Sequence, residues 1–596
     1  MSEFDAYCQR AGAWARQGRY PEAELSYREA IRLRPDDVKV RLDLAVVLRR
    51  QRRSADAESV LREAVTLGPE LASVHAELGA VLFEQARYRE SAGAFLKAAR
   101  LRPDFARAHV NLGLALDRLG DLVGAEHAFR EALRLRPDDS IARTNLGTVL
   151  RRQRRASDAE AVYRAGATRE GSAHSHVDLG RTLFEQRRYA EAAAEFREAI
   201  RLRGEDVKAR RALGLTLERL GHVHEAIAVY REALDLRPDD PELHRRLGLA
   251  LRRRRRYVES AAIFREALRL DPTSAHAHYH LGEVLERQGL YDAAVSSLRE
   301  AVRLRSNLIR AHLLLAVTLR RQGRWAEEAD AYSDAITLRP EDAELYSARG
   351  HALGALGDYE GAVVAFHRAL SLDPGASDVY YELGVALGRQ GKHAEAEIAL
   401  RAAVRLRPDD VKARANFALG LGRQGRHAEA EVAYREALLL RPEHHALHRG
   451  LGVSLYWQGR YQEAAVAFTE AIRIKPDYVR AHMDVGEMLA EQRRYIEAEA
   501  AYRRAVGLKP EAARAHAALG GVLLAQGRWD EAAEACREAI RLDVDLGRAH
   551  VDLWTALEAA HRYPELETAT RAVLERKADH VDAQARLARA IHAQNR

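Results

Sequence analysis

The sequence predicts an all-α chain built as a solenoid of stacked helical hairpins, and three observations predict it. Proline recurs at intervals of 34 residues or whole multiples of 34, apart from one interval that is a single residue short, at Pro35, Pro69, Pro103, Pro137, Pro238, Pro272, Pro340, Pro374, Pro408, Pro442, Pro476 and Pro510. Within the intervals, apolar residues recur at helical spacing in two runs. Small and large apolar residues also recur at fixed positions of these runs. A fixed period of this kind is the signature of a repeat array, in which each unit packs on its neighbours.

Each period contains two predicted helices. In the unit from Ala106 to Asp139, one apolar stripe fills the first half and a second stripe follows Gly120. Pro137 ends the second helix, because a proline inside a helix removes a hydrogen bond and clashes with the preceding turn. Asp138 or Asp139 can then accept hydrogen bonds from the free amides at the start of the next helix. The unit is therefore expected to fold as a helical hairpin.

Small residues mark the places where two helices must approach closely. They recur in the first helix as Gly113, Gly214, Gly282 and Gly384, and in the second helix as Ala132, Ala267, Ala369 and Ala471. An aromatic ring recurs at one position of the second helix, as Phe129, Phe196, Tyr230, Phe264, Phe366 and Phe468. Each ring is expected to be buried against the neighbouring helices.

Counted from the prolines, residues 1–580 are expected to form an array of about 17 units. The first unit runs from Phe4 to Asp37, and the last full unit runs from Gly547 to His580. Residues 581–596 read as a lone first helix, whose polar positions suit a cap over the last apolar face. No helix precedes Phe4, so the first unit is expected to have an incompletely covered face, and weak end-to-end self-association is the hypothesis that follows.

One unit boundary departs from the pattern. The stretch from Tyr163 to Gly180 is one residue short, with Gly166 and Ala167 in place of the usual Ala-Leu pair and Gly171 in place of proline. Loss of the buried leucine weakens the end of that helix by about 2 kcal/mol or more. We therefore predict a local kink or hinge at residues 163–175.

The composition indicates a surface of mixed charge over a core of small aliphatic residues. Hydrophobic residues make up 47% of the 596 residues but aromatic residues only 6%, as expected for closely packed helices. The 95 basic and 88 acidic residues leave a net charge of +7, which alone does not predict a nucleic-acid partner. Nearly all the basic residues are arginines. The base composition of a GC-rich bacterial genome is a simpler explanation for this than selection for planar donors.

The two cysteines, Cys8 and Cys536, are too few for a disulfide framework or a thiolate metal site. They favour a reducing, cytoplasmic location. The start of the chain, MSEFDAYCQR, lacks the apolar run of a secretory signal, and no segment approaches the length of a membrane span.

The repeat also carries the signature of a known family. Leu281, Gly282, Tyr291, Ala294 and Ala301 carry it in one unit, and it is nearly complete in another unit, as Leu451, Gly452, Tyr461, Ala464, Phe468, Ala471 and Pro476. In these motifs the chain resembles the tetratricopeptide-repeat family over nearly its full length. The resemblance implies a right-handed superhelix whose concave groove is lined by the first helix of each unit and usually holds an extended or helical peptide.

On that resemblance, the end of each first helix faces the groove. Arginine stands there in most units, as Arg50, Arg118, Arg152, Arg219, Arg253, Arg287, Arg321, Arg389 and Arg423, with gaps at Glu84, Glu185 and Ala355. Some units add a second arginine beside the first, as Arg49, Arg151, Arg252 and Arg320. We call all of these residues the arginine ladder.

The arginine ladder has two interpretations. Guanidinium forks bind carboxylates and phosphates bidentately, so the ladder could be a track for an acidic peptide or another polyanion. Cations near a helix C-terminus also offset the macrodipole, which is the simpler explanation. The second arginines favour the track, because dipole compensation does not require them.

Beyond the ladder, Tyr456 and Trp457 take the corresponding positions, and Glu487 and Glu491 follow in the next first helix. A partner with an acidic stretch followed by a hydrophobic anchor would complement both parts of the groove. Packing between neighbouring units explains the same residues equally well.

No motif predicts catalysis or a cofactor. The sequence has no P-loop, dinucleotide-binding fingerprint, nucleophile elbow or zinc-protease motif. His276, His280 and Glu283 would share one helical face and could bind a metal ion. Histidine nevertheless recurs in many units at one fixed position, which favours a packing or surface role. We expect no enzyme activity, no cofactor and no metal.

The sequence thus predicts a non-enzymatic scaffold or adaptor that binds extended acidic protein or peptide segments along a groove. Two alternatives stay open. One is binding of nucleic acid or another polyanion through the arginine ladder, against which the scarcity of stacking aromatic residues between the arginines counts. The other is a regulatory or substrate-recruiting subunit of a separately encoded enzyme or secretion machine.

Overall fold

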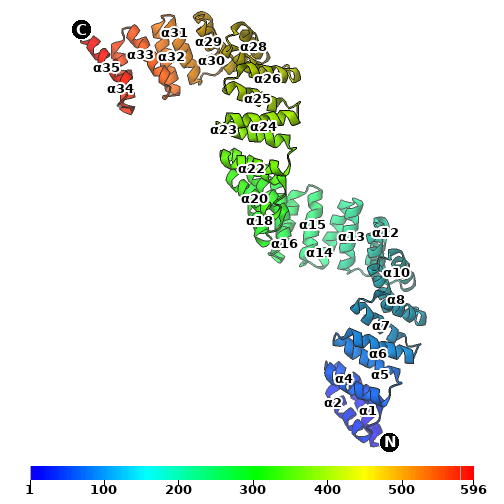
Figure 1. The fold of residues 1–596 in the computed structure, drawn as a ribbon. Helices are drawn as coiled ribbons and strands as arrows, with labels where there is room; N and C mark the ends of the chain where they lie inside the picture. Colours follow the sequence, from blue (N-terminus) through cyan, green and yellow to red (C-terminus); the bar gives the residue numbers. More distant parts are fainter. Residues whose placement is uncertain (1, 578, 596) are drawn as a thin grey trace. The chain divides into compact units, whose positions relative to one another are not determined.

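The computed structural model describes residues 2–577 and 579–595, and every regular element in that part of the chain is an α-helix (Figure 1). The chain divides into two compact units, residues 1–305 and 306–596. None of the described helices is both long enough and apolar enough to cross a membrane.

The first unit contains eighteen described helices. They are α1 (Glu3–Arg16), α2 (Tyr20–Leu33), α3 (Val38–Arg50), α4 (Ser54–Leu67), α5 (Ala72–Glu84), α6 (Tyr88–Leu101), α7 (Ala106–Leu119), α8 (Leu122–Leu135), α9 (Ser140–Arg152), α10 (Ala156–Glu170), α11 (Ala173–Glu185), α12 (Tyr189–Leu202), α13 (Val207–Leu220), α14 (Val223–Leu236), α15 (Pro241–Arg253), α16 (Tyr257–Leu270), α17 (Ala275–Arg287) and α18 (Tyr291–Leu304).

The second unit contains seventeen described helices. They are α19 (Ile309–Arg321), α20 (Trp325–Leu338), α21 (Ala343–Leu356), α22 (Tyr359–Leu372), α23 (Ser377–Arg389), α24 (His393–Leu406), α25 (Val411–Arg423), α26 (His427–Leu440), α27 (His445–Trp457), α28 (Tyr461–Ile474), α29 (Val479–Glu491), α30 (Tyr495–Leu508), α31 (Ala513–Ala525), α32 (Trp529–Leu542), α33 (Gly547–Ala559), α34 (Tyr563–Arg576) and α35 (Val581–Gln594).

Within each unit the helices form two layers. Each odd-numbered helix up to α33 packs against the even-numbered helix that follows it, which makes one hairpin. Most odd-numbered helices also contact the next odd-numbered helix, as α7 contacts α9 and α27 contacts α29, whereas no contact of that extent joins two even-numbered helices among the described residues. The odd-numbered helices therefore form the tighter layer, and we call their exposed surface the inner face.

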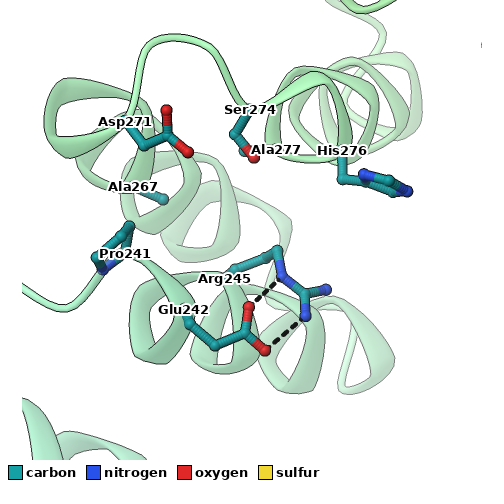
Figure 2. Close-up of a pocket in the computed structure, with 8 residues that line it drawn as sticks. All are labelled: Pro241, Glu242, Arg245, Ala267, Asp271, Ser274, His276 and Ala277. Carbon is teal, nitrogen blue, oxygen red and sulfur yellow. Dashed lines mark hydrogen bonds and ion pairs between the residues drawn. The ribbon is translucent and has the colours of Figure 1, made fainter. Parts of the chain in front are cut away.

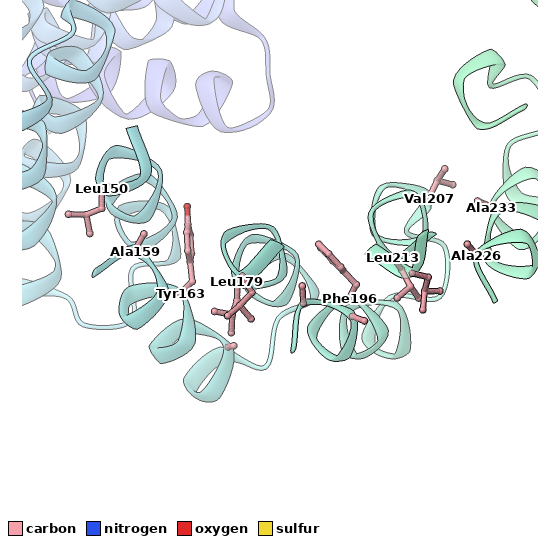
Figure 3. Packing of buried hydrophobic residues seen from close by; sticks show 14 of the residues in the cluster. Leu150, Ala159, Tyr163, Leu179, Phe196, Val207, Leu213, Ala226 and Ala233 are labelled. Carbon is pink, nitrogen blue, oxygen red and sulfur yellow. The ribbon is translucent and has the colours of Figure 1, made fainter. Parts of the chain in front are cut away.

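The core of each hairpin depends on a glycine in the first helix and a large side chain in the second. A Cβ atom added to Gly113 would lie 2.7 Å from the ring of Phe129, and one added to Gly147 would lie 2.3 Å from the ring of Tyr163. Both rings are almost fully buried. Figure 3 shows Tyr163 and Phe196 occupying equivalent places in successive hairpins. The expected burial of the recurrent ring is confirmed at Phe129, Phe196, Tyr230, Phe264, Phe366 and Phe468.

One hairpin inverts these sizes. In α33 the glycine position holds Trp554, and in α34 the ring position holds Thr570. Both side chains are fully buried. In this hairpin the side chain of Trp554, from the first helix, fills the space that a ring of the second helix fills in other hairpins.

Recurrent histidines fasten the hairpin boundaries. The Nε2–H of His75 donates a hydrogen bond to the carbonyl oxygen of Pro69, at 2.8 Å, six residues earlier. The same bond forms at the boundaries that lack proline, from His312 to Ser306 and from His550 to Val544. The other histidines that make it are His109, His244, His278, His448, His482 and His516. These histidines are structural, and they keep neighbouring hairpins in register.

The short boundary at residues 163–175 is built differently from the others. The neighbouring boundaries have four residues between helices, but only Gly171 and Ser172 separate α10 from α11, and α10 has 15 residues instead of 14. Gly171 has φ +53°, a left-handed conformation that suits glycine at the end of a helix. Arg143 packs its aliphatic stem over Gly166. The missing residue is thus absorbed in the linker, and the hinge stays a prediction.

A second recurrent network joins the even-numbered helices. Arg87, just before α6, donates hydrogen bonds to Glu58 of α4 at 2.8 Å and to Glu90 of its own helix at 2.6 Å. The same arrangement recurs at Arg53, Arg155, Arg188, Arg426, Arg460 and Arg528. Many of the arginines of this chain therefore form ion pairs that join neighbouring hairpins.

This network predicts a loss of stability in acid. Burial alone would raise the pKa of Glu160, but hydrogen bonds from Gln186 and Arg188 hold that pKa below its usual value, and Glu58, Glu126 and Glu499 behave in the same way. Because the pKa is lower in the folded chain than in the unfolded chain, the stabilisation is complete above the unfolded value of about 4.5 and is lost as the pH falls through the folded value. We expect Glu160→Gln to reduce the free energy of unfolding at pH 7 by about 0.2–1 kcal/mol.

Urea denaturation of both proteins at pH 7 and pH 3 measures this difference. It should be smaller at pH 3, because pH 3 lies below the unfolded value of about 4.5 and proton uptake by Glu160 in the unfolded chain then removes part of the stabilisation. Glu360→Gln is the control, because Glu360 is exposed and has no ion pair among the described residues. An equal difference at both pH values would show that the ion pair contributes nothing.

Candidate functional site

The arginine ladder separates in the structure into free and engaged side chains. Five of its members are exposed at the ends of odd-numbered helices and have no ion pair or hydrogen bond with another described side chain, namely Arg50, Arg118, Arg219, Arg389 and Arg423. They are available to an external anion, although each also stands where a helix C-terminus favours a cation.

Three of the four second arginines of the ladder hold neighbouring hairpins together. Arg151 forms a fork with Glu185 at 2.6 and 3.0 Å, and Arg49 pairs with Glu77 and Glu84. Arg252 pairs in the same way with Glu283. These contacts all run from one odd-numbered helix to the next, and Arg49 and Arg151 leave only 16% and 17% of their side chains exposed.

The remaining members of the ladder have other surroundings. Arg152 and Arg253 reach back to the preceding odd-numbered helix, where they pair with Asp117 and with Glu218, the latter at 2.8 Å. Arg320 is held within its own hairpin by Glu328 at 2.6 Å and by the hydroxyl of Tyr332 at 3.1 Å. Arg287 lies 3.7 Å from its neighbour Glu286, and Arg287 and Arg321 are exposed.

A large hollow opens on the inner face of the first unit. It has a volume of about 740 Å³ and lies against α11, α13 and α15. Its lining consists of Val177, Arg181, Phe184, Glu185, Phe196, Lys208, Arg211, Ala212, Leu215, Glu242 and Arg246. It combines an aromatic and aliphatic floor with cations from three helices.

Three of those cations are free. Arg181, Lys208 and Arg211 are exposed and have no ion pair or hydrogen bond with another described residue. Glu242, in contrast, is held by Arg246 at 2.9 Å and by a fork from Arg245 at 2.7 Å. The free cations give the hollow a surplus of positive charge.

Sequence reasoning did not single out these cations. The signal was present, since Lys208 and Arg211 stand three residues apart on α13, and Arg219, eight residues on, belongs to the same helical face. The arginine ladder was defined from residues at the helix ends, so it did not include Lys208 and Arg211, which lie earlier on the same face of α13.

A smaller hollow of about 450 Å³ lies beside the ends of α15, α16 and α17. Figure 2 shows Arg245 joined to Glu242, with Asp271, Ser274 and His276 on the neighbouring hairpin segments. His280, which the sequence grouped with His276, contacts Glu283 at 3.3 Å, and Glu283 also pairs with Arg252. Among the described residues, no group of three or more histidine, cysteine or acidic side chains is placed to hold a metal ion.

Tyr456 and Trp457 end α27 on the inner face of the second unit. The Trp457 side chain is 64% exposed, and its ring stacks on His427 with centroids 5.8 Å apart and an angle of 13°. Tyr456 packs edge-on against Trp457 at 5.4 Å and also contacts Tyr461 at 5.7 Å. The two residues thus belong to an aromatic cluster on the surface.

Comparison with protein families gives two matches. A model described as tetratricopeptide repeat matches residues 11–72, 77–139, 118–174, 177–241, 212–275, 245–309 and 486–545, which is more than half of the chain. A second model, described as the C-terminal domain of cilia and flagella-associated protein 70, matches residues 305–509. Repeat arrays of this kind typically act as non-enzymatic protein-interaction scaffolds.

Several solved structures resemble the chain at low similarity. The Cut9–Hcn1 hetero-tetramer of APC/C is 15% identical, with 88% of this chain and 97% of that chain covered and a TM-score of 0.32. YrrB, described as a TPR protein with an unusual peptide-binding site, is 23% identical, with 31% and 96% covered and a TM-score of 0.29. PilF of Pseudomonas aeruginosa is 25% identical, with 35% and 95% covered and a TM-score of 0.31. No curated protein matches the chain.

Proposed function

Since the chain belongs to the tetratricopeptide-repeat family, we propose that it is a non-enzymatic scaffold that binds extended acidic segments of partner proteins along its inner face. The family accounts for the coarse part of this function, which is protein interaction. The acidic character of the partner is the specific part, and it rests on the inner face of the first unit.

The observation that carries the proposal is the hollow against α11, α13 and α15. Arg181, Lys208 and Arg211 line it without an ion pair or hydrogen bond to another described residue, so their charges are available to carboxylates. The guanidinium groups can form charge-assisted forks with Asp or Glu side chains. Phe184 and Leu215 supply an apolar floor for a side chain that lies between the acidic ones.

The division of the arginine ladder supports the same function. Side chains such as Arg49 and Arg151 hold neighbouring inner helices together, which fixes the spacing of the surface. Arg118 and Arg219 are then presented at fixed places on that surface with their charges unused. Inner helices with a fixed spacing carry these cations at a regular interval, which suits an extended segment with acidic side chains.

We also propose a cytoplasmic location. Cys8 and Cys536 are both free thiols, as is usual in a reducing compartment.

Direct binding of a fluorescent acidic peptide tests the proposal. The probe is a peptide of alternating Glu and Leu residues, measured by anisotropy with the full chain. Changing Arg181, Arg211 and Arg219 to glutamine should weaken its binding about tenfold or more, as the loss of one to two charge-assisted contacts implies. The matched control changes Arg89, Arg265 and Arg504, which are exposed on even-numbered helices without ion pairs among the described residues, and should bind as the wild type does.

Equal weakening by both triple variants would mean that net charge alone drives the binding. No weakening by the first variant would assign the free arginines to helix-end electrostatics. Tighter binding of single-stranded DNA than of the acidic peptide, with the steep salt dependence of phosphate contacts, would instead establish nucleic-acid binding.

A further inference from the structure

We propose that the hollow against α11, α13 and α15 receives a phosphorylated side chain of the partner segment, so that phosphorylation of the partner strengthens its binding. We call this site the basic hollow. The inference rests on the proposed function, because it names the group that enters the same hollow. It goes further in its chemistry, since it requires a phosphate monoester with nearly two negative charges instead of a carboxylate with one.

The basic hollow has three cations without an ion pair among the described residues. Arg181 lies on α11, and Lys208 and Arg211 lie on α13. All three are exposed and line the hollow, and none of them forms a hydrogen bond with another described residue. Their charges are therefore available together to one external group.

The repeat places these cations close to one another. Lys208 and Arg211 are three residues apart, so they are neighbours on one face of α13. Helices α11 and α13 contact each other directly, and the axes of packed helices lie about 8–10 Å apart. Arg211 is equivalent in the repeat to Val177 of α11, one helical turn before Arg181. Side chains from both helices therefore reach the same space, and all of them line the one hollow.

The two acids that line the basic hollow are matched by other cations. Glu185 receives a fork from Arg151 of α9 at 2.6 and 3.0 Å. Glu242 receives hydrogen bonds from Arg245 at 2.7 Å and from Arg246 at 2.9 Å. Neither acid uses a charge of the three free cations. The hollow is therefore left with a surplus of positive charge.

One further acid, Asp178, stands three residues before Arg181 on α11 and is almost fully buried. Its Oδ2 lies 3.5 Å from Nε2 of His174. Burial raises the pKa of this carboxyl group, which favours its neutral form, and the charges of His174, Arg151 and Arg181 act in the opposite direction. Because the one carboxyl group is shared among three cations, it does not remove the surplus charge of the hollow.

A phosphate monoester matches this surplus better than a carboxylate does. Successive side chains of an extended segment point to opposite sides, so one side chain enters the hollow at a time. A glutamate there supplies a single negative charge. A phosphorylated side chain carries about −1.5 to −2 charges at pH 7 and three acceptor oxygens. It can therefore accept a guanidinium fork and a hydrogen bond from an ammonium group together.

Apolar side chains beside the cations strengthen this preference. Phe184, Ala212 and Leu215 are half-buried and line the same hollow. The ring of Phe184 is positioned by an edge-on contact with Tyr189, with centroids 5.3 Å apart. Charges attract each other more strongly beside groups of low dielectric constant than in open water. A dianion therefore gains more in this hollow than a single carboxylate does.

Binding of matched phosphopeptides to the full chain tests the inference. The parent probe is the fluorescent peptide of alternating Glu and Leu residues, and its central glutamate is replaced in turn by serine, phosphoserine, tyrosine and phosphotyrosine. A phosphorylated peptide should bind about tenfold or more tightly than the parent, as one added charge-assisted contact implies. A gain with either phosphorylated residue supports the inference, and the larger gain identifies the side chain that carries the phosphate.

Changing Lys208 and Arg211 to glutamine should reduce this gain to about twofold or less, because it removes two of the three free cations. The matched control changes Arg50 and Arg118, which are exposed arginines of the same inner face outside the lining of the hollow. It should affect the parent and phosphorylated peptides alike and so keep the gain. Thermal unfolding followed by circular dichroism checks that every variant is folded.

Binding of the parent peptide without a gain from either phosphorylated peptide would overturn the inference and leave the proposed function standing. A gain that survives the change of Lys208 and Arg211 would also overturn it, since the phosphate would then bind elsewhere. Absence of binding by every peptide would overturn the proposed function together with the inference.

Discussion

Gly350→Ala is expected to destabilise the hairpin of α21 and α22 by about 1–3 kcal/mol, the usual cost of overpacking a core. A Cβ atom added at Gly350 would lie 2.6 Å from the ring of Phe366, which is buried. Either the ring or one of the two helices must therefore move. The same chain has alanine at the equivalent position of other hairpins, such as Ala45 opposite Leu61, where the facing side chain is not a phenylalanine.

Gly354→Ala is a control on the same helix, one turn further along. No atom lies within 4 Å of a Cβ atom added at Gly354. Here alanine should stabilise the helix by about 0.5–1 kcal/mol, because glycine loses more backbone entropy on folding. Hydrogen exchange of the α21 and α22 amides measures both changes locally, which suits an array that opens in parts. Changes of the same sign in the two variants would contradict the packing argument.

Trp554→Gly is expected to cost about 3–5 kcal/mol in the hairpin of α33 and α34, since it empties a fully buried site. Thr570→Phe alone should cost about 1–3 kcal/mol, because the new ring would meet Trp554. The double variant recreates the pairing of Gly113 with Phe129. It should therefore lose much less than the sum of the single changes.

A double-mutant cycle measures this coupling. Protection of the α33 and α34 amides is compared in the wild type, the two single variants and the double variant. Additivity within about 0.5 kcal/mol would mean that the two sites do not share a volume. The indole Nε1 of Trp554 has no hydrogen-bond partner among the described residues, so part of the loss in Trp554→Gly is offset by removal of an unpaired donor.

The architecture was predictable from the sequence because it depends on a period. A 34-residue repeat places the same residue types at the same positions, so one hairpin defines the others. The hairpin turn after Gly120 and the ring position of Phe129 followed from local patterns of helix breaking and side-chain size. The role of the recurrent histidines was harder to specify, because His75 bonds to a backbone carbonyl that no side-chain pattern identifies.

The state of the arginines depended on contacts between repeats. The sequence showed Glu84 and Glu185 as gaps in the arginine ladder, and they are the partners of Arg49 and Arg151. The relevant spacing, about one period, joins residues that lie on different helices. A comparison of helix ends taken one at a time therefore could not distinguish arginines that pair with a neighbouring helix from arginines, such as Arg219, that have no ion pair with another described residue.

The inverted sizes of Trp554 and Thr570 limit how the gene for this chain can recombine with itself. Repeats of equal length invite unequal crossing-over, which adds or removes whole units without changing the reading frame. An exchange inside this hairpin would join the helix of Trp554 to a second helix that carries a ring, or the helix of Thr570 to a first helix that carries glycine. The first product would be overfilled and the second would contain a cavity. An exchange that moves this hairpin as a whole avoids both faults.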